Sequence, residues 1–376
     1  MKIVKIHTRK LSIPHRGNYH WNFGAPAGTN NVLVEVHTDA GIVGYGDALG
    51  SRSAVAAEAA IKSVEHILMG EDPFRIEYLV AQMYRRGNWH NQRRFANQAF
   101  AGIEMALWDI CGKALEQPVY NLLGGKIHDE IHWFGFLQGG GPDELAADAR
   151  RYVERGFDVL YLKVGMGAQR DLAAVRAVRE AVGEEPRLRI DPNEAWDRHT
   201  ALHMIRQLAP YGLDWVEQPL VFTDLAGAAL LRQQVDVPLA LDQALFTEAD
   251  VLAAIRLDAC DIVVLGFHET GGLLALKKAA ALAAAAGLPL NRHGALGESG
   301  ISTLAALQVL TTIPNLIDGN QVMHELFVED VLVEGLLDIE GGRTSVPAGP
   351  GLGAEINWDN VARFERLFEE EGQYPM

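Results

Sequence analysis

The chain has 376 residues, of which 48% are hydrophobic and 22% are charged, and its formal net charge at pH 7 is −16. This composition is typical of a globular protein, and the length suits one large domain with a smaller one attached. The acidic excess argues against binding to nucleic acid or to an anionic membrane, because nothing would offset the repulsion from phosphate.

The two cysteines, Cys111 and Cys260, lie far apart in sequence and in apolar surroundings. We expect both to be reduced, buried thiols. The first residues alternate like a strand and lack the apolar core of a signal peptide. The apolar run at 279–286 is too short to cross a bilayer. We therefore expect a cytoplasmic protein without a membrane segment.

The first 125 residues predict a separate α+β domain. Residues 2–12 alternate like a strand, and residues 31–46 predict a hairpin. From residue 53 to about 123 the pattern is helical, most clearly at 96–115, where apolar residues recur at spacings of three and four. A meander followed by helices, before any repeat begins, is typical of such a domain.

A polar and aromatic loop, residues 15–28, separates the first strand from the hairpin. Several ring side chains, including those of His20 and Trp21, lie within a stretch of five residues in this loop. Such rings are unfavourable to leave in water, so we give equal weight to an ordinary surface loop and to a loop that closes over a site. In the second case this loop and residues 51–55 would select the substrate.

A repeat follows residue 125. Strand-like runs begin near residues 132, 160, 188, 213, 238, 261, 288 and 315, mostly 25 to 28 residues apart, and helical patterns fill most of the gaps. Eight strands alternating with helices at this spacing are typical of a (β/α)8 barrel. An open doubly wound sheet is the alternative, but no Gly-x-Gly-x-x-Gly fingerprint follows the first strand.

Three consecutive strand-like runs end in an acidic residue: Asp191, Glu217 and Asp242. In a parallel barrel the C-terminal ends of the strands meet at one face, so these side chains would converge there. A hard divalent cation with oxygen ligands is the usual reason for tolerating this repulsion. The sequence therefore predicts a metal site held by these three residues.

The second barrel strand ends with Tyr161 and Lys163, which face the same way because side chains alternate along a strand. If that face is the interior, Lys163 lies opposite the acidic residues. Desolvation would then lower its pKa and the acids would raise it, and the sequence leaves the balance open. Beyond the sixth strand, His268 and Glu269 could reach inward, although a solvated loop pair is the favoured interpretation.

Short motifs recur along nearly the whole chain in a fixed order. They are Gly44–Asp47, Ala106–Asp109 with Gly112-Lys113, Leu122–Gly125, the three acidic strand ends, Gly271-Gly272 and Gly349–Gly353. Together they resemble the mandelate racemase and muconate lactonizing enzyme group of the enolase superfamily. The resemblance implies an α/β fold, a modified TIM barrel (β/α)7β at 126–345 with an N-terminal α+β capping domain at 1–125. It also implies that the tail at 346–376 packs back on the cap.

The resemblance further implies one Mg²⁺ per chain, held by Asp191, Glu217 and Asp242, and a small-molecule carboxylate as substrate. The family removes the proton from the carbon beside that carboxylate, with Lys163 as base, to form an ene-diolate. Cationic charge must be fixed beside the oxygens beforehand, because such a carbon acid is very weak. Asn193 is expected to support ligand or substrate oxygens. A homo-oligomer is also implied.

Two positions depart from the family pattern. The usual Lys-x-Lys of the second strand is Tyr161-x-Lys163 here, and the usual Lys or Asp of the sixth strand falls on Gly266. His293, near the end of the seventh strand, is then the best candidate for an acid or base opposite Lys163, and a structural histidine is its alternative. Further candidates for substrate contacts are His268, Glu298, His20 and Trp21.

With Lys163 and His293 on opposite faces, the site would racemise or epimerise a hydroxy acid or sugar acid. If the acid bears a β-hydroxyl group, the same pair supports dehydration, with His293 protonating the leaving group. A cycloisomerase of a lactone or unsaturated diacid is the alternative. A different class is a metal-binding barrel with lost or altered catalysis, suggested by Tyr161 and Gly266. A barrel hydrolase or aldolase of another family would need other metal ligands.

Overall fold

A three-stranded antiparallel sheet opens the chain in the computed structural model, which describes every residue except 18–19, 22–23, 51–52 and 376. Its elements are β1 (Ile3–Pro14), β2 (Gly28–Thr38) and β3 (Val43–Ala48), followed by α1 (Ala54–Leu68), α2 (Ile76–Arg86), α3 (Arg93–Ala114) and α4 (Val119–Leu122). The predicted strand and hairpin are confirmed, and the helix predicted at 96–115 begins three residues earlier.

Helix α3 packs very closely on β3, and this contact explains the Gly44-x-Gly46 motif. A Cβ atom added to Gly46 would lie 1.8 Å from the Gly102 carbonyl oxygen, and one added to Gly44 would lie 2.0 Å from that of Ala106. Only glycine permits this approach of strand to helix. The apolar face of β2 is buried in the same core as α1 and α3.

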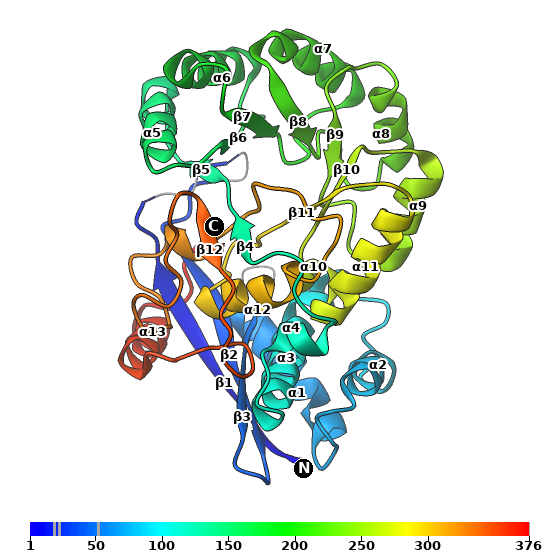
Figure 1. Cartoon of the computed structure of the whole chain (residues 1–376), viewed down its shortest axis with the longest axis vertical. Coiled ribbons are helices and arrows are strands. Elements are labelled where there is room, and N and C mark those ends of the chain that lie inside the picture. The colour runs from blue at the N-terminus through cyan, green and yellow to red at the C-terminus, as the bar shows by residue number, and fades with distance from the viewer. Residues whose placement is uncertain (18–19, 22–23, 51–52, 376) are drawn as a thin grey trace.

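The last helix, α13 (Trp358–Glu371), lies against the first sheet (Figure 1). Arg9 of β1 pairs with Glu365 at 2.9 Å, and the Ser12 hydroxyl donates to the Gly372 carbonyl at 2.9 Å. The end of the chain is thereby attached to the first sheet.

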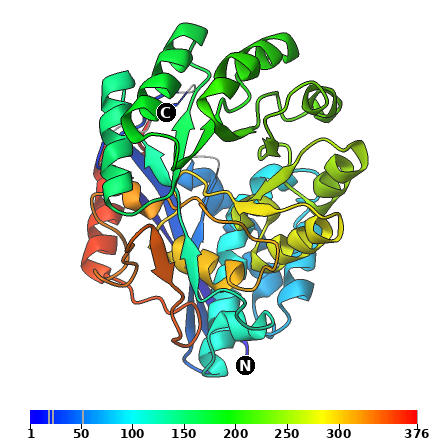
Figure 2. The same cartoon turned by 45° about the horizontal axis from the view of Figure 1, so that its top comes forward.

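Seven parallel strands form the second sheet, and each neighbours the next one in the chain. They are β5 (Gly135–Leu137), β6 (Val159–Lys163), β7 (Arg187–Asp191), β8 (Leu213–Glu217), β9 (Leu239–Leu241), β10 (Ile262–Leu265) and β11 (Leu290–Arg292). The helices that follow them are α5 (Pro142–Glu154), α6 (Ala168–Val182), α7 (Arg198–Leu208), α8 (Leu225–Arg232), α9 (Glu248–Leu257), α10 (Phe267–Thr270), α11 (Leu273–Ala285) and α12 (Gly300–Leu310). Most of these helices surround the strands (Figure 1 and Figure 2). The fold is a modified TIM barrel with an N-terminal α+β domain.

The two outermost predicted barrel strands differ from expectation. Residues near 132 form β4 (Glu130–His132), which pairs with β12 (Arg343–Ser345) outside the barrel. Residues 315–321 are not a regular strand, yet they bond to both edges of the sheet. The Leu290 amide donates to the Asn315 carbonyl at 2.8 Å, and the Phe134 amide donates to the Asn320 carbonyl at 3.0 Å.

The buried Arg189 explains the irregular closure. Its guanidinium, fully enclosed by the barrel, donates to the carbonyl oxygens of Asp318 and Gly319. The Asn291 side chain of β11 also donates to both carbonyl oxygens, so both accept hydrogen bonds from side chains at the point where regular strand pairing is interrupted. Cys111 and Cys260 are both buried and free, as expected. Within the described ranges, none of the helices combines the length and the apolar character that a membrane crossing needs.

Glu104 joins the cap to the barrel. This buried side chain of α3 accepts hydrogen bonds from the amides of Leu273 and Leu274, at the start of α11, at 2.9 and 3.1 Å. We expect Glu104→Ala to lower the free energy of unfolding by about 2 kcal/mol, because the first amides of α11 lose their acceptor. Chemical denaturation would measure the loss. Glu370→Ala, on the exposed face of α13, is the control and should change it little.

Candidate active site

The C-terminal ends of four neighbouring strands bring the predicted residues together. Lys163, Asp191 and Glu217 are the last residues of β6, β7 and β8, and Asp242 follows β9 directly. Because the strands are parallel and adjacent, their ends lie at the same face of the barrel. All three acidic side chains are almost fully enclosed, with at most 3% of their surface exposed.

The Tyr161 hydroxyl lies between two of the acids, 2.6 Å from Asp191 Oδ2 and 2.6 Å from Glu217 Oε1. Its ring stacks on Phe134 with a centroid separation of 4.4 Å. Burial and the two neighbouring acids raise the pKa of Tyr161 well above its ordinary value, so the phenol stays neutral and donates. This hydrogen-bond donor stands where the family pattern has a lysine.

Three neighbouring, buried carboxylates repel one another when all are charged, unless a cation offsets their charge. Burial raises the pKa of Glu217 to about 8, and the negative charges of Asp191 and Asp242 add to the effect. The Oδ2 atom of Asp242 is buried and has no hydrogen-bond partner among the described residues. A buried, unsatisfied carboxylate oxygen in an all-oxygen cluster fits a hard divalent cation.

Neighbouring backbone and amide groups hold the acids in place. The backbone N–H of Asn193 donates to Asp191 Oδ1 at 2.6 Å, and the Gln218 side-chain oxygen accepts from the backbone N–H of Asp242 at 3.0 Å. Asn193 and Gln218 both adopt positive φ angles, 44° and 33°, which non-glycine residues rarely do. Such strained positions often cluster at functional sites.

Lys163 and the acids also contact each other directly. Lys163 Nζ is 2.6 Å from Asp191 Oδ2, and the residue is 6% exposed. Tyr161 donates to the same oxygen, so Asp191 Oδ2 already has two hydrogen-bond donors. Over the ranges that the structure describes, no group of three or more His, Cys, Asp or Glu side chains is arranged as a ready metal site. Cation binding would require Asp191 to exchange its lysine contact for the metal.

His293 occupies the other side of the cluster. Its Nδ1 atom is 3.1 Å from Asp242 Oδ1, and its Nε2 atom is 3.6 Å from Glu269 Oε1. Burial alone would lower the pKa of His293, but Asp242 and Glu269 outweigh it and raise the pKa to about 10. The raised pKa favours the imidazolium form while Asp242 and Glu269 are both negatively charged. A divalent cation on Asp242 would weaken that effect.

His268 and Glu298 make their hydrogen bonds elsewhere. His268 is fully buried, 3.0 Å from the Ser302 hydroxyl, and burial lowers its pKa to about 4, so it is neutral. Glu298 is equally buried and pairs with Arg292. The solvated loop pair that the sequence favoured for His268 and Glu269 is wrong, because both side chains are buried, and Glu269 is the one that lies beside His293. The missing side chain at Gly266 was the signal that could have identified it.

Two residues of the 15–28 loop, His20 and Trp21, lie near the barrel residues of the site. Trp21 packs against a cluster that contains Phe134, Phe136, Tyr161 and Met323. His20 lines a small pocket that also contains Lys163. The remaining predicted loop positions, 18–19, 22–23 and 51–52, lie outside the described residues.

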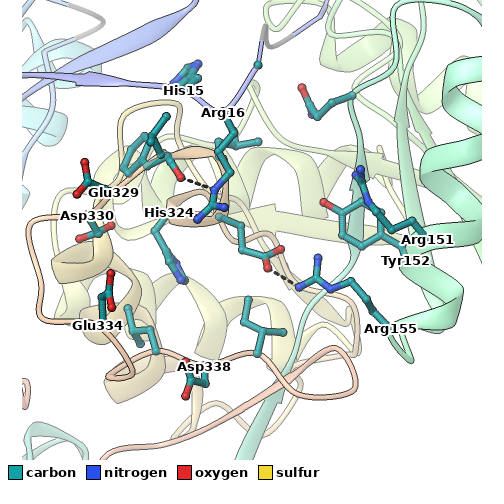
Figure 3. A pocket seen from close by; sticks show the side chains of 18 of the residues that line it. His15, Arg16, Arg151, Tyr152, Arg155, His324, Glu329, Asp330, Glu334 and Asp338 are labelled. Atoms are coloured by element: carbon teal, nitrogen blue, oxygen red, sulfur yellow. Dashed lines mark hydrogen bonds and ion pairs between the residues drawn. The ribbon is translucent and has the colours of Figure 1, made fainter.

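A large pocket of about 1090 Å³ lies beside the mouth. Figure 3 shows it between the cap residues His15 and Arg16, helix α5 and the segment around His324, with Arg155 paired to Glu325. It contains none of the three acids, but His20 lines both this pocket and the smaller one beside Lys163. The large pocket therefore adjoins the site and does not cover the acidic cluster.

Two family models match the sequence. Residues 4–124 match the mandelate racemase/muconate lactonizing enzyme N-terminal domain, and residues 144–360 match the enolase C-terminal domain-like family. An N-succinyl-L-Arg/Lys racemase from Bacillus cereus is 30% identical over 369 residues, covering 96% of this chain and 97% of the relative. A D-galactarolactone cycloisomerase from Agrobacterium fabrum is 32% identical over 89% of this chain and 91% of its own length. An arabinonate dehydratase from Saccharolobus solfataricus is 30% identical over 86% and 88%.

Solved structures agree. The crystal structure of the Bacillus cereus N-succinyl Arg/Lys racemase has a TM-score of 0.89 at 28% identity, over 97% of this chain and 98% of that one. A dipeptide epimerase from Enterococcus faecalis, complexed with Mg and the dipeptide L-Leu-L-Tyr, has a TM-score of 0.88 at 27% identity, over 94% and 100%. The family match and the Mg in the epimerase structure support a divalent metal ion. The chain belongs to the mandelate racemase/muconate lactonizing enzyme family of the enolase superfamily.

Proposed function

We propose that the protein is a Mg²⁺-dependent enzyme that removes the α-proton of a hydroxy acid or sugar acid. The product would be the racemised or epimerised acid, or the dehydrated acid where a β-hydroxyl group can leave. One observation carries the proposal: a lysine and a histidine contact different members of the same acidic cluster, Lys163 at Asp191 and His293 at Asp242.

Asp191, Glu217 and Asp242 would each give carboxylate oxygens to one Mg²⁺. When bound, the ion supplies positive charge beside the substrate carboxylate, where negative charge develops as the proton leaves. Asn193 and Gln218 keep Asp191 and Asp242 in position through the hydrogen bonds described above.

Lys163 and His293 would act on opposite faces of the substrate. Once Asp191 has exchanged its lysine contact for the metal, the neutral Lys163 amine would accept the α-proton on one face of the substrate, and His293 would return a proton on the other face, which inverts the centre. If a β-hydroxyl group lies on the histidine side, His293 protonates it and water leaves. Tyr161 stays neutral and keeps its hydrogen bonds to the acids, so it takes no proton from the substrate.

Cycloisomerisation of a lactone or unsaturated diacid is the second candidate, because a relative with 32% identity is a D-galactarolactone cycloisomerase. That reaction needs one proton carrier, and His293 would then serve only in binding. The two candidates predict different isotope patterns.

Incubation in D₂O with Mg²⁺ and a panel of acid sugars, hydroxy acids and lactones tests the proposal. We expect deuterium at the α-carbon, with inversion for an epimerase or with formation of a keto acid for a dehydratase. Ring opening or closure without α-inversion would favour the cycloisomerase. A lack of exchange with every acid, with Mg²⁺ binding confirmed by calorimetry, would overturn the proposed chemistry.

A further inference from the structure

We propose that Glu269 is the residue that positions His293 for proton transfer, in place of a side chain on the barrel strand itself. The inference rests on the proposed function and adds one residue to it. Gly266 ends the strand region at β10, where the family pattern has a lysine or aspartate, and Glu269 follows three residues later on α10. One helical turn brings its side chain back above the strand end.

The Glu269 carboxylate fills the space that a side chain at position 266 would take. A Cβ atom added to Gly266 would lie 2.0 Å from Glu269 Oε2 and 3.1 Å from the His293 carbonyl oxygen. Glu269 is 4% exposed, and its Oε1 atom is 3.6 Å from His293 Nε2. The glycine therefore makes room for a carboxylate that reaches in from the next turn.

The cap fixes the main chain of Glu269. Asn97 of α3 is fully buried, and its side-chain amide donates to the Glu269 carbonyl at 2.6 Å and to the Phe246 carbonyl at 3.1 Å. Its oxygen accepts from the Tyr84 hydroxyl at 2.5 Å. Phe246 lies in the segment that follows Asp242. One buried amide thus sets the spacing between the two main-chain segments whose carboxylates contact His293.

Only one of these carboxylates stays available to His293 when the metal site is filled. Asp242 would be one of the residues that hold Mg²⁺, so Glu269 would remain as the carboxylate partner of the ring. With Nε2 facing Glu269 at 3.6 Å, Nδ1 is directed at the acidic cluster, 3.1 Å from Asp242. The geometry assigns Nδ1 as the atom that gives the substrate its proton, which solvent afterwards replaces.

The test is a comparison of the two faces in D₂O, with both stereoisomers of an acid that the wild-type enzyme exchanges. Glu269→Gln should slow exchange at the His293 face about 100-fold, as expected for loss of an effective acid–base group, and leave exchange at the Lys163 face within about threefold. His293→Asn should likewise slow exchange at the His293 face only. Lys163→Ala should slow exchange at the Lys163 face only. Equal loss at both faces, or no loss at all, would overturn the inference.

Moving the carboxylate from position 269 to position 266 should restore part of the exchange that Glu269→Ala loses. In Gly266→Asp/Glu269→Ala the carboxylate stands on the strand, in the space that Glu269 vacates. We expect this double variant to exchange at the His293 face about tenfold faster than Glu269→Ala alone. A purely structural role of Glu269 would not be rescued in this way, and absence of rescue together with an unchanged fold would count against the inference.

A second measurement needs no substrate. In a crystal structure of Mg²⁺-loaded Glu269→Ala, the His293 ring should leave the orientation that it has in Mg²⁺-loaded wild type. An unchanged ring would overturn the positioning role. Failure of the proposed function is recognised separately, because the wild-type enzyme would then exchange no acid whatever the orientation of the ring.

Discussion

Lys163→Arg is expected to abolish α-proton exchange on one face of the substrate while the fold and the metal site persist. Arginine keeps the positive charge that pairs with Asp191 at 2.6 Å in the wild type, but it cannot lose a proton near neutral pH. Lys163→Ala removes the charge as well. Both variants should lose about 10⁴-fold in exchange at this face, the upper range for a positioned general base.

Comparison of the two variants separates chemistry from structure. If Lys163→Ala is inactive and Lys163→Arg is active, the residue contributes charge alone and is not the base. Lys62→Ala, on an exposed position of α1, is the control for expression and handling, and it should match the wild type. Exchange would be followed by NMR with each stereoisomer, because a loss on one face only is what two proton carriers require.

The acidic strand ends were predictable from the sequence because their geometry depends only on chain periodicity. Asp191, Glu217 and Asp242 close three consecutive parallel strands, and parallel strands end at one face. Side-chain alternation likewise put Tyr161 and Lys163 on one side of β6. These are local rules, and the observed contacts of both residues with Asp191 follow from them.

The choice between His268 and Glu269 was harder to predict, because it depends on a turn of only four residues. Helix α10 follows Gly266 at once, and a rotation of about 100° per residue decides whether His268 or Glu269 faces the barrel. The outcome depends on partners that are distant in sequence. His268 is held by the Ser302 hydroxyl, 34 residues away, and Asn97 holds the Glu269 carbonyl from the cap, 172 residues away.

The irregular eighth segment has the same kind of cause. An extended pattern near residue 315 predicted a strand, but the carbonyl oxygens of Asp318 and Gly319 accept from Arg189, about 130 residues earlier in the chain. No pattern within the segment itself records this buried guanidinium. Long-range contacts of this kind decide the details of a site after periodicity has decided its location.

Loss of a metal ligand should produce the other large effect, and it should be visible without any substrate. Calorimetry is expected to detect Mg²⁺ binding to the wild-type protein, and at 100 times the dissociation constant the ion should add about 2.7 kcal/mol to the free energy of unfolding. Asp242→Asn and Glu217→Gln should bind Mg²⁺ more than about 100-fold more weakly, since even groups that only support a metal ligand contribute 10–100-fold. Glu180→Gln, on an exposed position of α6, is the control and should bind normally.

Glu217→Gln weakens Mg²⁺ binding, but in the metal-free protein the same substitution should increase stability. Folding raises the pKa of Glu217 from 4.5 to about 8, so the folded state holds a proton that the unfolded state releases. The stability of the metal-free wild type should therefore decline as the pH rises from about 4.5 to about 8, and Mg²⁺ should reverse the decline. Glu217→Gln, which carries no charge at any pH, should show a flatter pH dependence and a higher melting temperature than the metal-free wild type at pH 8. Equal pH profiles for the two metal-free proteins would mean that burial and the neighbouring acids do not raise the pKa of Glu217, and would contradict the proposed metal site.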